Sequence, residues 1–80
     1  MTLAEAGDAA AQNWLGVIYQ NGKGVERDYA EAVKWYYMAA RQGHADAQNN
    51  LGLMCQNGIG VQQDDAEAAQ WYYLAARQGH

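Results

Sequence analysis

Apolar residues recur along the chain at spacings of three and four residues, the period of one face of an α-helix. Glycine-rich segments separate these stretches, and the chain contains no proline. The pattern predicts an all-α protein with helices near residues 9–20, 28–42, 45–56 and 64–78. In the second and fourth helices, alanine and aromatic side chains form the apolar face: Ala32, Trp35, Tyr36, Ala39 and Ala40, then Ala68, Trp71, Tyr72, Ala75 and Ala76.

Capping residues mark the ends of these two helices. Asp28 and Asp64 stand at the expected N-cap positions, where a carboxylate accepts from orphan amide groups and suits the positive end of the helix dipole. Glu31 and Glu67 follow three residues later, the spacing of a capping box. Gly43 is expected to end the second helix in the left-handed conformation.

The first and third helices contain an internal glycine each, Gly16 and Gly52. A glycine inside a helix costs about 1 kcal/mol relative to alanine, so we expect a neighbouring helix to approach closely at both positions. The apolar face consists of Ala11, Leu15, either Val17 or Ile18, and Tyr19 in one helix, and of Ala47, Leu51, either Leu53 or Met54, and Cys55 in the other.

The chain is a tandem repeat. A shift of 36 residues aligns residues 7–44 with residues 43–80, and 25 of the 38 aligned pairs are identical. We therefore expect a partial preceding repeat at residues 1–7, resembling the last turn of a helix, then one repeat at 8–43 and a second at 44–80.

The acidic balance of the chain excludes two classes of partner. Nine acidic and five scattered basic residues give a net charge of −4. Nucleic acids and anionic membranes both bind clustered lysine and arginine, so we expect neither as a partner. No apolar run approaches the ~18 residues that span a bilayer, and the first six residues lack the pattern of a signal peptide. The chain is expected to be soluble, with its compartment left open.

No catalytic or metal-binding constellation is present in the sequence. Cys55 is the single cysteine and has no internal disulfide partner. His44 and His80 each follow a helix-ending glycine without a second ligand nearby, so we interpret them as linker residues. Asp64 and Asp65 are adjacent in the second repeat alone. We expect no enzyme activity, no metal and no cofactor.

The repeated motif resembles the Sel1-like repeat, a relative of the tetratricopeptide repeat, over nearly the whole chain. The second unit repeats every motif residue except one, because Cys55 replaces a tyrosine. The resemblance implies an α/α superhelix, or solenoid, of antiparallel helix pairs, whose first helices line a concave surface that binds proteins or peptides. In the first unit the motif residues are Ala11, Leu15, Gly16, Tyr19, Gly22, Gly24, Val25, Asp28, Ala32, Trp35, Tyr36, Ala39, Ala40 and Gly43.

The resemblance also implies which side chains point into the groove. Amide side chains suit this role, because each can donate to a carbonyl and accept from an N–H of an extended backbone. The alternative interpretation, an ordinary solvated helix surface, stays open for each of these residues. The implied groove residues are Asn13, Trp14, Val17, Gln20, Asp46, Asn49, Asn50, Leu53 and Gln56, followed by Asn21 and Asn57 at the helix ends.

Trp14 interrupts the repeat, because Asn50 takes its place 36 residues later. It is either an aromatic anchor for a partner or, as we favour, packed against the turn at residues 1–6. The tyrosine pairs at 36–37 and 72–73 resemble base-stacking platforms. Their helical spacing and the acidic charge instead favour packing in the core.

The leading functional hypothesis is a protein–protein interaction scaffold, an adaptor that holds a protein or peptide segment in the groove. The alternative is a structural spacer, or a self-associating segment of a larger protein without its own ligand. Two repeats leave the last helix uncovered, so Tyr73, Leu74 and part of the Trp71 ring should be exposed and able to form a homo-oligomer. A cysteine-rich branch of the family is linked to β-lactams, but that resemblance requires paired cysteines in each repeat.

Overall fold

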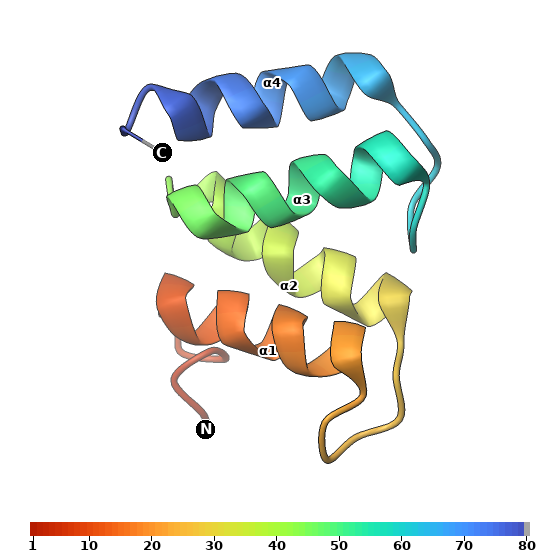
Figure 1. The fold of residues 1–80 in the computed structure, drawn as a ribbon. Helices are drawn as coiled ribbons and strands as arrows, with labels where there is room; N and C mark the ends of the chain where they lie inside the picture. The colour runs from red at the N-terminus through yellow and green to blue at the C-terminus, as the bar shows by residue number, and fades with distance from the viewer. Residues whose placement is uncertain (80) are drawn as a thin grey trace.

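The computed structural model describes residues 1–79, and within them the chain forms four helices. These are α1 (Ala9–Asn21), α2 (Tyr29–Arg41), α3 (Ala45–Asn57) and α4 (Asp65–Ala76). The helices form two antiparallel pairs, in which α2 packs between α1 and α3 while α1 and α4 lie at opposite ends of the stack (Figure 1). The all-α prediction is confirmed, and each helix boundary agrees with its prediction to within two residues. None of these helices is long and apolar enough to cross a membrane.

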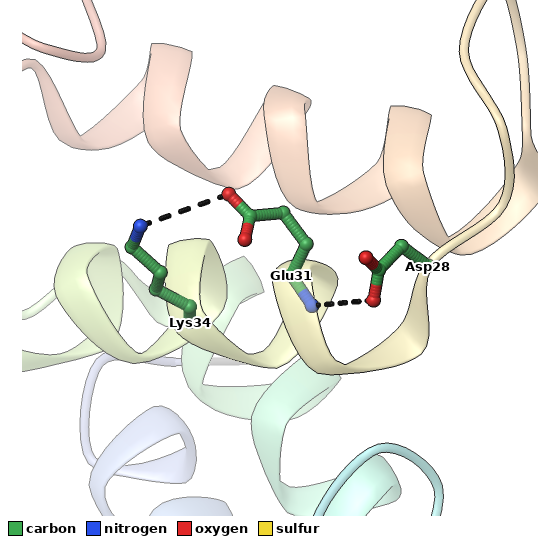
Figure 2. A network of polar contacts seen from close by, with 3 residues as sticks. All are labelled: Asp28, Glu31 and Lys34. Atoms are coloured by element: carbon green, nitrogen blue, oxygen red, sulfur yellow. Dashed lines mark hydrogen bonds and ion pairs between the residues drawn. The ribbon is translucent and has the colours of Figure 1, made fainter.

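The predicted caps of α2 and α4 are confirmed. The Asp28 carboxylate accepts from the backbone N–H of Glu31 at 3.1 Å, and Asp64 accepts from that of Glu67 at 3.0 Å. Figure 2 shows that the Glu31 side chain then turns toward Lys34, where its carboxylate lies 3.7 Å from the ammonium nitrogen. Glu67 accepts from the Cys55 thiol. The N–H groups of Asp28 and Asp64 donate to the Tyr19 and Cys55 carbonyls, so neither glutamate completes the reciprocal half of a capping box.

Two further caps were not predicted. The Asp8 carboxylate accepts from the backbone N–H of Ala11 at 2.9 Å and begins α1. At the equivalent position of the second repeat, Nδ1 of His44 accepts from the backbone N–H of Ala47 at 3.2 Å and begins α3. His44 is thus a helix cap rather than a plain linker residue. His80, the next equivalent position, lies outside the described residues.

The close approach predicted at the helix glycines is confirmed. A methyl group on Gly16 would overlap the Tyr36 ring of α2, and one on Gly52 would lie 2.8 Å from the Tyr72 ring of α4. The tyrosine ring of the second helix therefore packs directly on the backbone of the first helix in each repeat. This contact offsets the conformational cost of glycine in a helix.

The core is centred on α3, because this helix is packed between α2 and α4. Leu51, Met54 and Cys55 are fully buried there. Met54, not Leu53, therefore supplies the apolar face, which settles the alternative that the sequence left open. The buried apolar cluster comprises Ala32, Tyr36, Ala39, Ala40, Ala47, Leu51, Met54, Cys55 and Ala68.

Two buried glutamines form a hydrogen-bond ladder that fixes the register between successive repeats. The Gln48 side-chain amide donates to the Ala40 carbonyl at 3.1 Å, and its oxygen accepts from the Gln78 amide at 2.8 Å. Both polar ends of this buried side chain are therefore satisfied, as burial requires. One repeat earlier, Gln12 makes the same two bonds, to Ala4 at 3.1 Å and from Gln42 at 2.8 Å.

Residues 1–7 form a single capped turn against the start of the stack. The Thr2 N–H donates to the Glu5 carboxylate at 2.9 Å, and the Glu5 N–H donates to the Thr2 hydroxyl at 3.2 Å, which completes a capping box. Ala4 is as buried as Ala40, its equivalent in the first repeat. The turn therefore occupies the position that the last turn of α2 occupies against α3.

The two helix glycines should respond differently to alanine. Tyr36 is fully buried and unable to move aside, so we expect Gly16→Ala to lower the free energy of unfolding by about 1–3 kcal/mol, the usual cost of overpacking. Tyr72 is half-buried and free to shift, so Gly52→Ala should be closer to neutral. Urea unfolding monitored by circular dichroism tests this order, and a Gly16→Ala protein as stable as the wild type would contradict the close contact.

The cap of α3 offers a second test. Because Asp8 begins the first repeat with a carboxylate, we expect His44→Asp to raise the free energy of unfolding by roughly 0.5–1 kcal/mol through the helix dipole. His44→Ala should lower it by about 1 kcal/mol. Asp8→Ala is the matched control and should be destabilising by a similar amount. If thermal unfolding shows that His44→Ala is as stable as the wild type, the His44 imidazole does not stabilise α3 as an N-cap.

Candidate functional site: the first-helix surface

The predicted groove residues lie on α1 and α3, the first helices of the two repeats. We call their shared face the first-helix surface, defined by Asn13, Val17, Gln20, Asn49, Leu53 and Gln56. The side-chain amide of Asn50 on α3 donates to the side-chain oxygen of Asn13 on α1 at 3.0 Å. Both asparagines are half-buried, so this bond joins the two helices directly. Asn13 and Asn50 consequently have a structural role in addition to any contact with a partner.

Gln20 and Gln56 are each held by a tyrosine of their own repeat. The Tyr36 hydroxyl donates to the Gln20 side-chain oxygen at 2.5 Å, and the Tyr72 hydroxyl donates to that of Gln56 at 2.9 Å. These are the same tyrosines that pack on the helix glycines. Each bond uses one of the two lone pairs of the amide oxygen and orients the NH₂ group.

Asn49 and Leu53 are the two residues of α3 in this surface that the bonds described above do not engage. Leu53 is 45% exposed, whereas Val17, its equivalent on α1, is packed against the core. Asn49 is half-buried, and among residues 1–79 no hydrogen bond engages its side-chain amide. The two are four residues apart and therefore lie on the same side of α3. Asp46 is exposed in the first turn of the same helix.

The favoured interpretation of Trp14 is wrong. Its side chain is 61% exposed and therefore does not pack into the turn at residues 1–7. The reason is its position in the repeat. Asn50, its equivalent, reaches back to the first helix of the preceding repeat, and the single turn at residues 1–7 provides no such helix for Trp14.

Two shallow depressions, of about 330 and 310 Å³, repeat at the ends of the second helices. Gln12 and Gln42 line one, and Gln48 and Gln78 line the other. Both are open to solvent and contain the glutamine ladder that holds the repeats in register. Sequence reasoning missed these glutamines because their partners are distant in the chain.

The Sel1 repeat model matches two consecutive segments, residues 9–44 and 45–80. The chain belongs to the Sel1 repeat family. A Sel1 repeat protein from Oxalobacter formigenes has a similar structure, with 45% identity and a TM-score of 0.94 over 100% of this chain and 33% of its own. No curated protein matches the sequence.

Two further solved structures are similar to this Sel1 chain. One is c5321, a protective antigen of uropathogenic Escherichia coli displaying an SLR fold, with 51% identity and a TM-score of 0.94 over 96% of this chain and 16% of its own. The other is Helicobacter pylori cysteine rich protein B, with 29% identity and a TM-score of 0.91 over 95% of this chain and 57% of its own. The Sel1 chain thus spans less than two thirds of each of these proteins.

An aromatic contact connects the two Sel1 repeats. The Tyr37 ring meets the Trp71 ring edge to face, with centroids 6.0 Å apart and planes at 83°. Trp35 and Trp71 are half-buried, and their indole nitrogens are buried without an acceptor among the described residues. The predicted core packing of the tyrosine pairs is confirmed for Tyr36 alone, because Tyr72 is half-buried and Tyr37 and Tyr73, which point away from the core, are 44% and 63% exposed.

Cys55 is buried and its thiol donates to the Glu67 carboxylate at 3.3 Å. Burial raises the pKa of this thiol to about 11, and the hydrogen bond and negative charge of Glu67 act in the same direction. Such a thiol is a poor nucleophile at neutral pH, because the thiolate is the reactive form. In the part of the chain that the structure describes, no group of three or more His, Cys, Asp and Glu residues is placed to hold a metal ion.

The stability of the Sel1 chain should fall in alkaline solution. The pKa of the Cys55 thiol is raised in the folded state from 9.0 to about 11, so the folded state binds this proton more tightly. The resulting stability is fully present below pH 9.0 and is lost as the pH rises to about 11. Burial likewise raises the pKa of Tyr36 from 10.0 to about 12, which extends the loss to higher pH.

Urea unfolding across this pH range provides the measurement. Cys55→Ser is the matched control, because a hydroxyl can donate to Glu67 without titrating in the same range. The free energy of unfolding of this variant should depend less steeply on pH than that of the wild type. Equal slopes for the two proteins would show that ionisation of Cys55 is not linked to folding.

Proposed function

We propose that this chain is an adaptor that binds an extended segment of a partner protein across the first-helix surface. Sel1 repeats are often protein–protein interaction modules. The observation that carries the proposal is the pairing of Asn49 with Leu53 on α3. The Asn49 amide, which has no hydrogen-bond partner within residues 1–79, and the exposed Leu53 side chain lie one helical turn apart. This arrangement suits a ligand with both a backbone to bond and a side chain to bury.

In this proposal the amides of the surface have different roles, which their hydrogen bonds support. Asn49 has both a donor and an acceptor for a peptide group. Gln20 and Gln56 contribute donors, because their oxygens accept from tyrosines. Asn13 and Asn50 maintain the spacing of α1 and α3 through their mutual bond. Contacts to the ligand backbone favour an extended segment and depend little on its sequence.

The remaining predicted residues belong to the edges of this surface. Val17 contributes the part of its side chain that the core leaves open. Asp46 adds a negative charge at the start of α3, which favours a basic residue in the ligand. Trp14 lies at the edge of α1, where it is exposed. Most of the affinity for the ligand is therefore expected from α3, and less from α1.

A displayed library of unstructured peptides selected against the wild-type chain tests the groove. For peptides recovered in this way, Asn49→Ala and Leu53→Ala should each weaken binding by roughly five- to tenfold, the effect of about 1 kcal/mol. Helicity and thermal unfolding should not change, because both side chains are at least partly exposed. Calorimetric titration provides the dissociation constants.

The matched control for this experiment is Gln70→Ala. Gln70 is an exposed amide on α4 and is not part of the first-helix surface. Its replacement should leave peptide binding unchanged. Peptides that bind Asn49→Ala and Leu53→Ala as tightly as the wild type would place the binding site elsewhere. Asn50→Ala is unsuitable as a sole test, because it also removes the bond to Asn13.

We also propose a second function, association with further copies through the ends of the stack, which corresponds to a spacer or self-associating role. Ala76 and Tyr72 of α4 are more exposed than Ala40 and Tyr36, their buried equivalents on α2. The difference arises because α3 covers α2, whereas no described helix covers that side of α4. A scattering mass that stays monomeric up to high micromolar concentration would contradict this second function.

A further inference from the structure

The contact between the two repeats provides a template for what the ends of the stack can bind. Besides the apolar packing of α2 on α3, the contacts that join the repeats include the Tyr37 ring to the Trp71 ring, Asn50 to Asn13, and the Gln48 amide to the Ala40 carbonyl. Tyr37, Asn13 and Ala40 belong to the first repeat, and their equivalents in the second repeat are Tyr73, Asn49 and Ala76. These three residues therefore present the same surface at the C-terminal end of the stack. Tyr73 is 63% exposed, compared with 44% for Tyr37, which has its tryptophan in place.

The start of the stack carries the complementary set. Trp35 is equivalent to Trp71, Trp14 to Asn50, and Gln12 to Gln48. On the same side of α1, Leu15 and Ile18 are only half-buried, whereas Leu51 and Met54, their equivalents on α3, are fully buried against α2. The first repeat therefore presents the apolar and hydrogen-bonding groups that would complete the contacts of α4.

We infer that a second copy of this chain docks head to tail, with its α1 on α4 of the first copy in the register that α3 adopts on α2. This register rests on the second proposed function, end-to-end association. In it Gln12 of one copy donates to the Ala76 carbonyl of the other, and Tyr73 meets Trp35 edge to face. Trp14 covers Asn49, the position equivalent to the contact between Asn50 and Asn13.

The turn at residues 1–7 occupies the position on α1 that α4 of a second copy needs. Ala4 is equivalent to Ala76 by two repeat lengths, and its carbonyl already accepts the Gln12 amide at 3.1 Å. The turn and the last turn of α4 from a second copy therefore compete for one donor and one buried alanine site. Met1 and Leu3 are largely exposed, so the turn is held by few apolar contacts. It acts as a cap that a second copy displaces.

Complementary variants test the register. Tyr73→Glu blocks the C-terminal end and Trp14→Glu blocks the N-terminal end, and both side chains are exposed enough to leave folding intact. Each change should weaken self-association by about thirtyfold, the effect of losing an aromatic hot spot. Mixed in equal amounts, the two proteins should form a one-to-one dimer that does not grow further, because each retains the end that the other lacks.

Leu74→Glu is the matched control. Leu74 is 39% exposed, nearly the same as the 37% of Met38, whose neighbouring repeat is in place. A further repeat therefore does not cover this position, and Leu74→Glu should associate like the wild type. Light scattering after gel filtration, over a range of concentrations, gives the masses. A Trp14→Glu protein that still dimerises alone would overturn the head-to-tail register while leaving end-to-end association in place.

Substitution in the turn tests the cap. An arginine does not fit the buried site of Ala4, so Ala4→Arg should release the turn from α1. The fraction of molecules that can bind a second copy then increases, and the affinity for that copy should rise by roughly tenfold. Leu3→Arg adds the same charge at an exposed neighbour and should have no effect. If the wild type associates but Ala4→Arg does so no better, the turn is not a competitor. If the wild type and all variants, Ala4→Arg included, are monomers, both the register and end-to-end association are rejected. Peptide binding to Asn49 and Leu53 is measured in a separate experiment and is not affected by this result.

Discussion

The packing of a tyrosine ring on a helix glycine determines the geometry of each repeat. Because Gly16 has no side chain, the Tyr36 ring reaches the backbone of α1 and sets the distance between the paired helices. The same ring carries its hydroxyl to Gln20 on the first-helix surface. One residue therefore links the core to the orientation of a surface amide. Gly52, Tyr72 and Gln56 reproduce the arrangement in the second repeat.

The second constraint is the register between repeats, and buried glutamines provide it. An apolar contact between helices tolerates sliding, whereas the two bonds of Gln48 to Ala40 and Gln78 are satisfied at one position only. A displaced helix would leave a buried amide without partners, which costs more than the loss of a typical exposed hydrogen bond. This register places Asn50 against Asn13. The spacing of α1 and α3 in the first-helix surface therefore depends on the buried glutamines, which are not part of that surface.

Helices, N-caps at Asp28 and Asp64, and the close approach at Gly16 were predictable from sequence, because periodicity, cap chemistry and the cost of glycine are local properties. The duplication strengthened these predictions by showing each feature twice. The duplication also concealed features that differ between the repeats, because two equivalent residues have the same role only where their neighbours are equivalent too. Trp14 was misplaced for this reason: its environment depends on what precedes the repeat. The partners of Gln12 and Gln48 were not predicted because they are brought together by folding.

Equivalent residues at the centre and at the ends of the stack thus differ in what they can bind. Asn13 is engaged by Asn50, whereas Asn49, with the same sequence position in its repeat, has no such neighbour among the described residues. The two proposed functions both draw on this difference, because a peptide and Trp14 of a second copy would contact the same amide. Binding at shared groups is mutually exclusive to the extent that the contacts overlap, and linkage makes the effect reciprocal. On the two proposals together, a chain whose first-helix surface holds a peptide is expected to be a poorer acceptor for the next copy, and Asn49 would connect the capture of a partner with the growth of the assembly.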